Sequence, residues 1–351
     1  MALCDCAEPR GGNERPDNVR YRAVVVGGAD GIKGAALEGV STTPSDCAEG
    51  VPHAAGTPCA SKKIASAIVA FAESIDAGEG GGAAAASASP LLPTAKTPEA
   101  KAVRAVAKIL GCDSESCVVA HPDFRSFATE NELASGARID ADLEVRFKEQ
   151  GPRNSTELLS NTNIDGVLRR WAREFPEFFP CPFAMMDFDA TGEAFAEIDL
   201  PDVLEGKVPK GLADGLDLGP RRCFGCVVNT DVSSGRGKHW VAVFVDCRAG
   251  AAPWSVEYFN SSGRAPPKPM VRWMERSRAR LADYRAAKGT KAADVVAVPV
   301  TDLDHQESKT ECGLYALYYI RRRLEGSPYA VFTEKIVPDA AMFKFRAHVF
   351  R

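Results

Sequence analysis

Residue types that support thiol catalysis follow one another at the ends of predicted secondary-structure elements. His239 opens the segment HWVAVFVD, Asn260 closes WSVEYFN, and Gln306 lies six residues before Cys312. A thiol is a good nucleophile as its thiolate, and both a helix N-terminus and a nearby imidazolium lower a thiol's pKa. Cys312 begins the predicted helix CGLYALYYIRRR, and His239 can supply the imidazolium. The pattern therefore predicts a cysteine nucleophile with a histidine base.

Each member of this set has a predicted role in acyl transfer. His239 would take the thiol proton of Cys312 and later give it to the leaving amine, while Asn260 would accept the Nδ1 proton of His239. The side-chain amide of Gln306 and the backbone N–H of Cys312 would stabilise the oxyanion. Gly313 would let the substrate backbone approach closely. This mechanism needs no cofactor or metal.

Two other residues compete for these roles. Asp246 follows His239 by seven residues on the same predicted strand, so it would lie roughly 23 Å away at ~3.3 Å per residue. Asn260 is therefore the preferred partner of His239. His305 directly precedes Gln306 in an extended segment, where neighbouring side chains point apart, so we interpret it as a loop residue.

The eleven cysteines are odd in number and irregularly spaced, and the N-terminus has no apolar core of a secretory signal. This pattern favours free thiols in a reducing compartment over a disulfide framework. Cys223 and Cys226 form a CxxC pair, but a structural zinc site normally needs a second pair, and strand alternation puts these two thiols on opposite faces. We interpret them as core residues, and Cys112 and Cys117 as ordinary buried thiols.

The elements that must hold the catalytic residues alternate between strands and helices. Strands rich in Val, Phe, Tyr and Trp are predicted at 223–230, 239–246, 254–260 and 294–300, and helices at 267–288 and 312–324. Strand runs next to helix runs indicate an α+β domain. The aromatic residues upstream are predicted to be core residues and not the lining of a groove: Trp171, Phe175, Phe178 and Phe179.

The composition changes sharply near residue 93. Residues 1–92 are rich in Gly, Ala, Ser and Pro and are predicted to be a mostly disordered leader, with a short helix at KKIASAIVAFAESI. Residues 93–160 are predicted to form a helical arm, and 161–351 the catalytic domain. Thr97 and Gly111 would bound the first helix, and Thr162 with Asp165 would form a capping box for a helix over 165–174. The glycine-rich stretch 22–34 lacks a P-loop ending and is interpreted as a turn.

The net charge of the chain indicates which classes of binding partner to expect. The chain has 43 basic and 47 acidic residues and a formal net charge of -4, which argues against a general nucleic-acid or anionic-membrane binder. Arg321, Arg322 and Arg323 are interpreted as a solvated helix end. No segment approaches the ~20 apolar residues of a membrane span. Nucleic acid stays a candidate only as an activator, and the oligomeric state is open.

Several segments carry a family resemblance. HWVAVFVD, YFNSSG and HQESKTECGLYALYYI resemble the adenovirus-protease and SUMO-deconjugase superfamily of cysteine proteases, over roughly residues 150–351. GPRNSTELLSNTNIDGVLRRW and VPDAAMFKFRAHVF are similar to proteases of nucleocytoplasmic large DNA viruses of the African swine fever virus type. The resemblance implies a papain-like α+β core in the permuted order His239, Asn260, Gln306, Cys312, with a helical N-terminal region. It also implies that Trp240 contacts substrate.

What the resemblance implies about function is specific. Enzymes of the viral type cleave capsid and core precursors during virion assembly, after small residues such as Gly-Gly or Ala-Gly. We therefore expect an endopeptidase whose partner is a structural precursor protein and whose location is the virion or the viral factory in the host cytoplasm. A protease that deconjugates ubiquitin-like modifiers such as SUMO is the first alternative. The second is a binding module, which would still function with Cys312 replaced by Ser.

Overall fold

The structure of the chain, a computed structural model, describes residues 46–48, 56–76, 89, 91–152, 157–207, 219–251, 253–289 and 294–351. The chain divides into two compact units. One contains Asn154–Arg346 and is called the sheet unit here. The other, called the helical unit, consists of Ser41–Arg153 together with Ala347–Arg351.

A mixed β-sheet forms the centre of the sheet unit. Its strands are β1 (Phe178–Pro180), β2 (Ala184–Met185), β3 (Cys223–Asn229), β4 (Trp240–Asp246), β5 (Trp254–Phe259) and β6 (Val295–Val300). The order is β1-β3-β4-β5-β6, and β2 also pairs with β3. The strands β3, β4 and β5 are antiparallel to one another, whereas β1 and β2 run parallel to β3, and β6 runs parallel to β5. The four predicted strands are confirmed, and β1 and β2 are additional.

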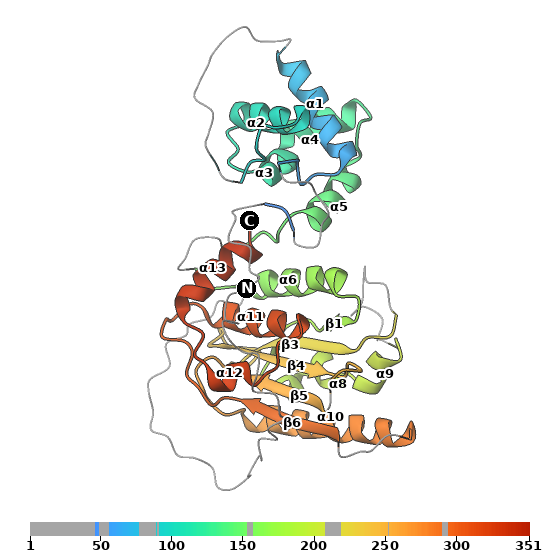
Figure 1. Ribbon diagram of the computed structural model, residues 1–351, viewed down its shortest axis with the longest axis vertical. Helices are drawn as coiled ribbons and strands as arrows, with labels where there is room; N and C mark the ends of the chain where they lie inside the picture. The colour runs from blue at the N-terminus through green and yellow to red at the C-terminus, as the bar shows by residue number, and fades with distance from the viewer. Residues whose placement is uncertain are drawn as a thin grey trace. The chain divides into compact units, whose positions relative to one another are not determined.

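Helices cover both faces of this sheet (Figure 1). The helix α11 (Cys312–Leu324) contacts β3 and β4, and α6 (Asn161–Glu174) contacts β1. On the other face, Val241, Val243 and Val245 pack in one apolar cluster with Met270 and Trp273 of α10 (Lys268–Ala287). Short helices α7 (Phe188–Thr191), α8 (Ala194–Glu197), α9 (Leu200–Leu204) and α12 (Val331–Glu334) complete the unit. The period-2 pattern of β4 therefore separates two hydrophobic layers.

The start of α6 differs from the prediction. Ser160 is the N-cap, and it forms a capping box with Asn163 instead of the predicted Thr162–Asp165 pair. Ser160 and Asn163 have the same spacing two residues earlier, and Asp165 Oδ1 already accepts the Phe183 N–H at 2.8 Å. The predicted aromatic core is confirmed at Trp171 and at Phe178 and Phe179 of β1, which are all buried.

Five helices make up the helical unit: α1 (Lys62–Asp76), α2 (Pro98–Leu110), α3 (Glu115–Ala120), α4 (Pro122–Glu130) and α5 (Gly136–Arg146). As predicted, α2 is capped by Thr97 and ends at Gly111, whose φ of 69° is left-handed. Ile64, Ile68 and Phe71 of α1 are buried in one cluster with residues of α2. The short helix predicted at KKIASAIVAFAESI is therefore confirmed as α1, and its apolar stripe explains why it folds within a range otherwise predicted to be mostly disordered.

The unit boundaries also correct the prediction. The helical unit begins at Ser41 and not near residue 93. The last five residues belong to it as well, although 161–351 was predicted to be catalytic. Lys148 Nζ donates to the Ala347 carbonyl at 2.9 Å, and the ring of Phe350 fills the space that a Cβ on Gly151 would take. Residues 1–45, which include the glycine-rich stretch 22–34, lie outside the described residues, as do residues 49–55, 77–88 and 90.

The cysteine prediction is wrong in the helical unit. Cys47 is bonded to Cys59 and Cys112 to Cys117, with Cα atoms 5.1 and 5.6 Å apart, within the disulfide range. Sequence spacing alone does not reveal such proximity. The described cysteines of the sheet unit form no disulfide and are buried, as predicted for Cys223 and Cys226. Among the described residues, no group of three or more His, Cys, Asp or Glu could hold a metal ion.

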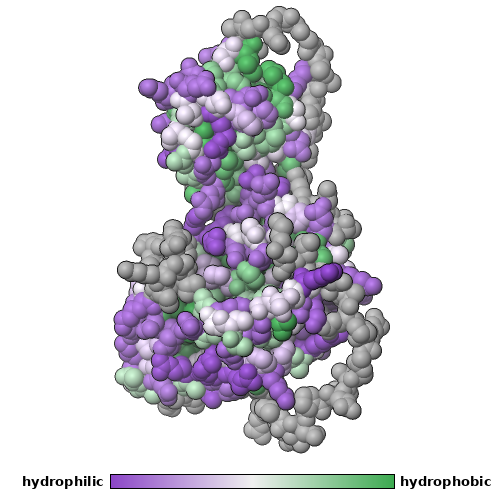
Figure 2. Space-filling model, turned by 180° about the vertical axis from the view of Figure 1, so that it is seen from behind, coloured by the Kyte–Doolittle hydropathy of each residue, from purple (hydrophilic) through white to green (hydrophobic). Residues whose placement is uncertain are grey.

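The surface of the described chain is largely polar. Viewed from behind, the visible face of the sheet unit is mostly hydrophilic, with hydrophobic residues scattered over it (Figure 2). In the part of the chain that the structure describes, no helix combines the length and hydrophobicity that a bilayer span requires.

Candidate active site

Three of the predicted site residues meet where β4 begins, β5 ends and α11 begins. His239 directly precedes β4, Asn260 directly follows β5, and Cys312 is the first residue of α11. His239 Nε2 lies 2.8 Å from Asn260 Oδ1, and His239 also forms a hydrogen bond with Cys312. Because β4 and β5 are antiparallel neighbours, the start of one and the end of the other share an edge of the sheet.

Asn260 is held in one orientation by its other contacts. Its Nδ2 donates to the Arg264 carbonyl and to Tyr258 Oη, each at 3.2 Å. A carbonyl can only accept, so the opposite end, Oδ1, must face His239. The backbone N–H and hydroxyl of Ser262 also donate to Oδ1, at 3.0 and 2.8 Å. With an acceptor in front of it, His239 Nε2 must carry a proton.

This geometry corrects the predicted ring orientation. We expected Nδ1 of His239 to face Asn260, but Nε2 does. The Nδ1 atom is thereby left for Cys312. Burial lowers the pKa of His239, but the hydrogen bond and charge of Cys312 and the hydrogen bond of Asn260 outweigh it, so the pKa is raised above its ordinary 6.5. A raised pKa favours the imidazolium, which is the form that pairs with a thiolate.

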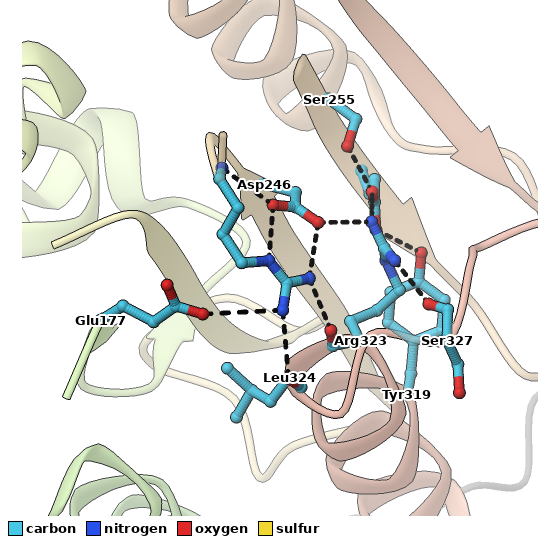
Figure 3. Close-up of polar contacts among 9 residues, drawn as sticks. Glu177, Asp246, Ser255, Tyr319, Arg323, Leu324 and Ser327 are labelled. Atoms are coloured by element: carbon cyan, nitrogen blue, oxygen red, sulfur yellow. Dashed lines mark hydrogen bonds and ion pairs between the residues drawn. The ribbon is translucent and has the colours of Figure 1, made fainter. Parts of the chain in front are cut away.

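A buried ion network holds α11 against the two strands that end at the site (Figure 3). Arg323 lies 2.8 Å from Glu257 of β5 and 3.0 Å from Asp246 of β4. Arg248 also binds Asp246, at 2.6 Å, and Tyr319 donates to Glu257 at 2.6 Å. Asp246 therefore forms ion pairs with Arg248 and Arg323. As its position on the strand predicted, it does not face His239. The network sets where α11, and with it Cys312, lies relative to β4 and β5.

The arginine run at the end of α11 is not the solvated helix end that we expected. Arg321 and Arg323 are only 7% and 5% exposed. Arg321 forms two hydrogen bonds with Glu174 of α6, at 2.6 and 2.8 Å, and Arg322 pairs with Glu325 at 2.7 Å. The sequence could not indicate this, because the acidic partners lie up to 147 residues away.

Gln306 lies in the loop that connects β6 to α11. Its Oε1 accepts a hydrogen bond from Ser261 at 2.8 Å, and its Nε2 donates to the Ser308 carbonyl at 2.9 Å. The Ser261 carbonyl in turn accepts the backbone N–H groups of His305 and Gln306. Since Ser261 follows Asn260, Gln306 is tied directly to the loop of the candidate site. His305 is a buried residue whose ring contacts Phe332 and Val337.

The residue before the nucleophile is a buried carboxylate that the sequence analysis did not single out. Glu311 is fully buried and accepts hydrogen bonds from the hydroxyls of Ser308 and Thr310. Arg346 of α13 (Asp339–Val349) lies 3.4 Å from its Oε1. The N–H of Ser308 donates to Asp339 at the other end of the same helix segment. Two charged residues of α13 therefore hold the turn that leads into Cys312.

The two predicted substrate contacts face protein instead. Trp240 is 1% exposed, and its Nε1 donates to the Leu159 carbonyl at 3.2 Å. A Cβ added to Gly313 would lie 3.1 Å from the Cβ of Leu159. The missing side chain of Gly313 thus makes room for Leu159 and not for a substrate backbone. Trp240 and Gly313 support the site by packing around this one residue.

Sequence reasoning missed the residues that orient Asn260: Tyr258, Ser262 and Arg264. One signal was present for Ser262. An asparagine often accepts a hydrogen bond from the backbone two residues later, and NSSG is a typical turn sequence. The contacts of Tyr258, Arg264 and Leu159 depend on the fold and have no local signal.

Comparison with known proteins places the chain in a family. The model of the Ulp1 protease family, C-terminal catalytic domain, matches residues 227–350. The SUMO-1 cysteine protease of African swine fever virus is 40% identical over 315 residues, which cover 90% of this chain and 98% of the viral protein. A cysteine protease from another strain of the same virus gives the same figures. A crystal structure of the African swine fever virus protease matches with a TM-score of 0.67 and 38% identity, over 90% of this chain and 98% of that one.

Proposed function

Because the chain belongs to the Ulp1 protease family of cysteine proteases, we propose that it is an endopeptidase that processes viral structural precursors during virion maturation. The observation that carries the mechanism is the contact of His239 with both Asn260 and Cys312. The similarity to the viral protease supports a role in virion maturation, because the aligned region covers 98% of that protease and 90% of this chain. A location in the virion or in a viral factory in the host cytoplasm belongs to the same proposal.

In the proposed mechanism, Cys312 attacks the scissile carbonyl as a thiolate. Its proton goes to His239 Nδ1, while Nε2–H stays hydrogen-bonded to Asn260 and fixes the ring. Collapse of the tetrahedral intermediate breaks the C–N bond, and His239 returns the proton to the leaving amine. Water then hydrolyses the thioester and regenerates the thiol, with His239 as general base. The raised pKa of His239 stabilises the charged pair before attack.

Gln306 and the backbone N–H of Cys312 are the proposed oxyanion donors. An amide nitrogen carries two N–H groups, and one of those on Gln306 is used by the Ser308 carbonyl. The second is left for the substrate oxygen. Because Ser261 also binds Gln306 Oε1, the amide is prevented from flipping and keeps its donor end in place. Fixed donors of this kind contribute about 3–4 kcal/mol to transition-state stabilisation.

A deconjugase of ubiquitin-like modifiers is the second candidate. It is favoured by the match to the Ulp1 family model and by the name SUMO-1 cysteine protease that the viral relative carries. The same catalytic residues would serve both activities. The two differ in what is recognised: a maturation protease needs a short peptide around the cleavage site, whereas a deconjugase needs the folded modifier.

The test is cleavage of matched Gly-Gly-X and Ala-Gly-X peptides and of a SUMO fusion. We expect the wild-type chain to cleave the peptides and Cys312→Ala to lose all cleavage. Cys247→Ala, which removes another buried thiol, is the control and should keep activity. Cleavage of the SUMO fusion alone would replace the precursor role by deconjugation. A Cys312→Ala protein that still cleaves would contradict the thiol mechanism.

A further inference from the structure

A cavity of about 450 Å³ lies in the sheet unit near the candidate active site. Its walls include the apolar side chains of Phe183, Met185 and Phe195. Its polar lining includes Asn161, Glu193 and Ser233. The volume lies in the range of pockets that enclose ligands, and it is ample for one long side chain.

The register of the strands places this cavity close to His239. Met185 of β2 pairs with Asn229 of β3, and Asn229 pairs with Trp240 of β4, the residue after His239. Two inter-strand steps of ~4.8 Å put the Cα of Met185 roughly 10 Å from that of Trp240. The ring of Phe183 also packs edge-on against Trp240, with centroids 6.1 Å apart. An extended substrate covers such a distance in about three residues.

The opposite wall is linked to the nucleophile. Asn161 is the first residue of α6, two positions after Leu159. Leu159 packs against Gly313, the residue after Cys312, and accepts the hydrogen bond of Trp240. The cavity is therefore bounded on one side by Phe183, which packs against Trp240, and on the other by Asn161, two residues after the Leu159 that contacts both Gly313 and Trp240.

The polar groups of the cavity are mainly acceptors. Asn161 Oδ1 is buried and has no hydrogen-bond partner among the described residues. Glu193 accepts the Met185 N–H at 2.9 Å and the hydroxyl of Thr191 at 3.3 Å. Burial and then the nearby charge of Asp187 raise the pKa of Glu193, and among the described residues no cation is a cause that lowers it. Ser233 directs its hydroxyl and its N–H to Asp187. A ligand that supplies a positive charge and N–H donors fits this lining.

We propose that the cavity is a substrate subsite that takes a lysine or arginine side chain two to four residues from the scissile bond. The inference rests on the proposed peptidase function and adds a specificity to it. The aliphatic stem would lie against Phe183 and Phe195, and the cationic end would bind Glu193 and Asn161 Oδ1. A purely apolar side chain would leave both acceptors desolvated and unpaired.

The test uses Gly-Gly peptides with lysine, norleucine or glutamate at each position two to four residues from the cleavage site. Norleucine matches the lysine stem without its charge. At one position we expect kcat/KM for lysine to exceed that for norleucine by about ten-fold, which corresponds to about 1.4 kcal/mol. Glu193→Gln keeps an acceptor for the Met185 N–H and should reduce the ratio towards one. Asn161→Asp adds a second negative charge and should increase it. Glu197→Gln, on the exposed side of α8, is the matched control and should change nothing.

Binding of the same peptides to Cys312→Ala makes the test independent of turnover. The same ranking in Kd would support the subsite even if wild-type cleavage were too slow to measure. Equal Kd values for lysine and norleucine at every position would overturn it, as would a Glu193→Gln variant that weakens all peptides equally. The proposed function is judged separately, by whether the wild-type chain cleaves the norleucine peptides and Cys312→Ala does not.

Discussion

The two units of the chain bury carboxylates in different ways. In the sheet unit, Asp246 and Glu257 are compensated by Arg323. Burial raises the pKa of Asp246, but Arg248 and Arg323 outweigh that effect and lower it overall. In the helical unit, Glu115 accepts the backbone N–H groups of Cys59 and Ala60, at 2.9 and 2.8 Å.

This difference has a consequence for protonation. Burial is the largest cause that raises the pKa of Glu115 to about 7, and the charges of Asp46 and Asp142 add to it. Two neutral donors therefore do not offset desolvation, whereas a guanidinium does. The arginine network of the sheet unit keeps Asp246 ionised and connects α11 to β4 and β5, while the helical unit holds an acid that titrates near neutral pH.

Removing the positive charge that Arg323 places beside Asp246 and Glu257 should have the largest effect on stability. Arg323→Met would leave Glu257 and Asp246 buried with less positive charge, and we expect the sheet unit to lose about 3–5 kcal/mol. All four tryptophans lie in this unit, so tryptophan fluorescence during urea unfolding measures its stability. Arg322→Met is the control, since its partner Glu325 is exposed, and should cost less than about 1 kcal/mol. Equal losses in the two variants would contradict the comparison.

The helical unit should respond to pH through Glu115. A carboxyl group whose folded pKa is raised from 4.5 to about 7 destabilises the fold as pH rises through that interval. The full effect is about 3 kcal/mol at 1.36 kcal/mol per pKa unit. We expect amide exchange in α3 to accelerate between pH 5 and pH 8, after correction for its intrinsic pH dependence.

Two variants sharpen this prediction. Glu115→Gln removes the titrating group, so most of the pH dependence in α3 should disappear. Glu130→Gln, at the exposed end of α4, should leave it intact. If amide exchange in α3 still depends on pH in Glu115→Gln, the titration belongs to other groups.

The parts of the fold that could be predicted from the sequence are those with a local cause. The strands β3 to β6 are runs of β-branched and aromatic residues, and α11 begins at Cys312 as predicted. His239 and Asn260 could be assigned to neighbouring strand ends because two antiparallel strands joined by a short connection must pair. Thr97 and Gly111 bound α2 through their own side-chain and backbone preferences.

What could not be predicted depends on residues that meet only in the folded chain. Arg323 and Glu257 are 66 positions apart, and Cys47 and Cys59 are brought together by the packing of the helical unit. The proton on His239 Nε2 follows from the Arg264 carbonyl, which fixes the amide of Asn260 with its oxygen toward the ring. The short helix predicted at KKIASAIVAFAESI is α1, but the composition of residues 1–92 did not indicate that this helix packs against α2 in a folded unit.

The smallest effect that we predict is on catalysis and concerns Arg346. Its partner Glu311 precedes Cys312 and binds Ser308, so Arg346→Met leaves an uncompensated charge beside the nucleophile and loosens the turn that carries it. We expect kcat to fall by roughly 10- to 100-fold with little change in KM, because small displacements of reacting groups have effects of that size. Lys344→Met, on the exposed side of α13, is the control.

A purely structural role for Arg346 would give a different pattern. In that case the loss of activity would follow the loss of tryptophan-monitored stability, and Glu311→Gln would not rescue it. If Arg346 positions the catalytic groups electrostatically, an unpaired Glu311 should raise the pKa of His239 further and move the alkaline limb of the kcat/KM profile to higher pH. Combining Arg346→Met with Glu311→Gln removes both charges and should return that limb towards the wild-type value. The comparison between the units then extends to the active site, where compensation of a buried acid sets the charge state of the catalytic pair.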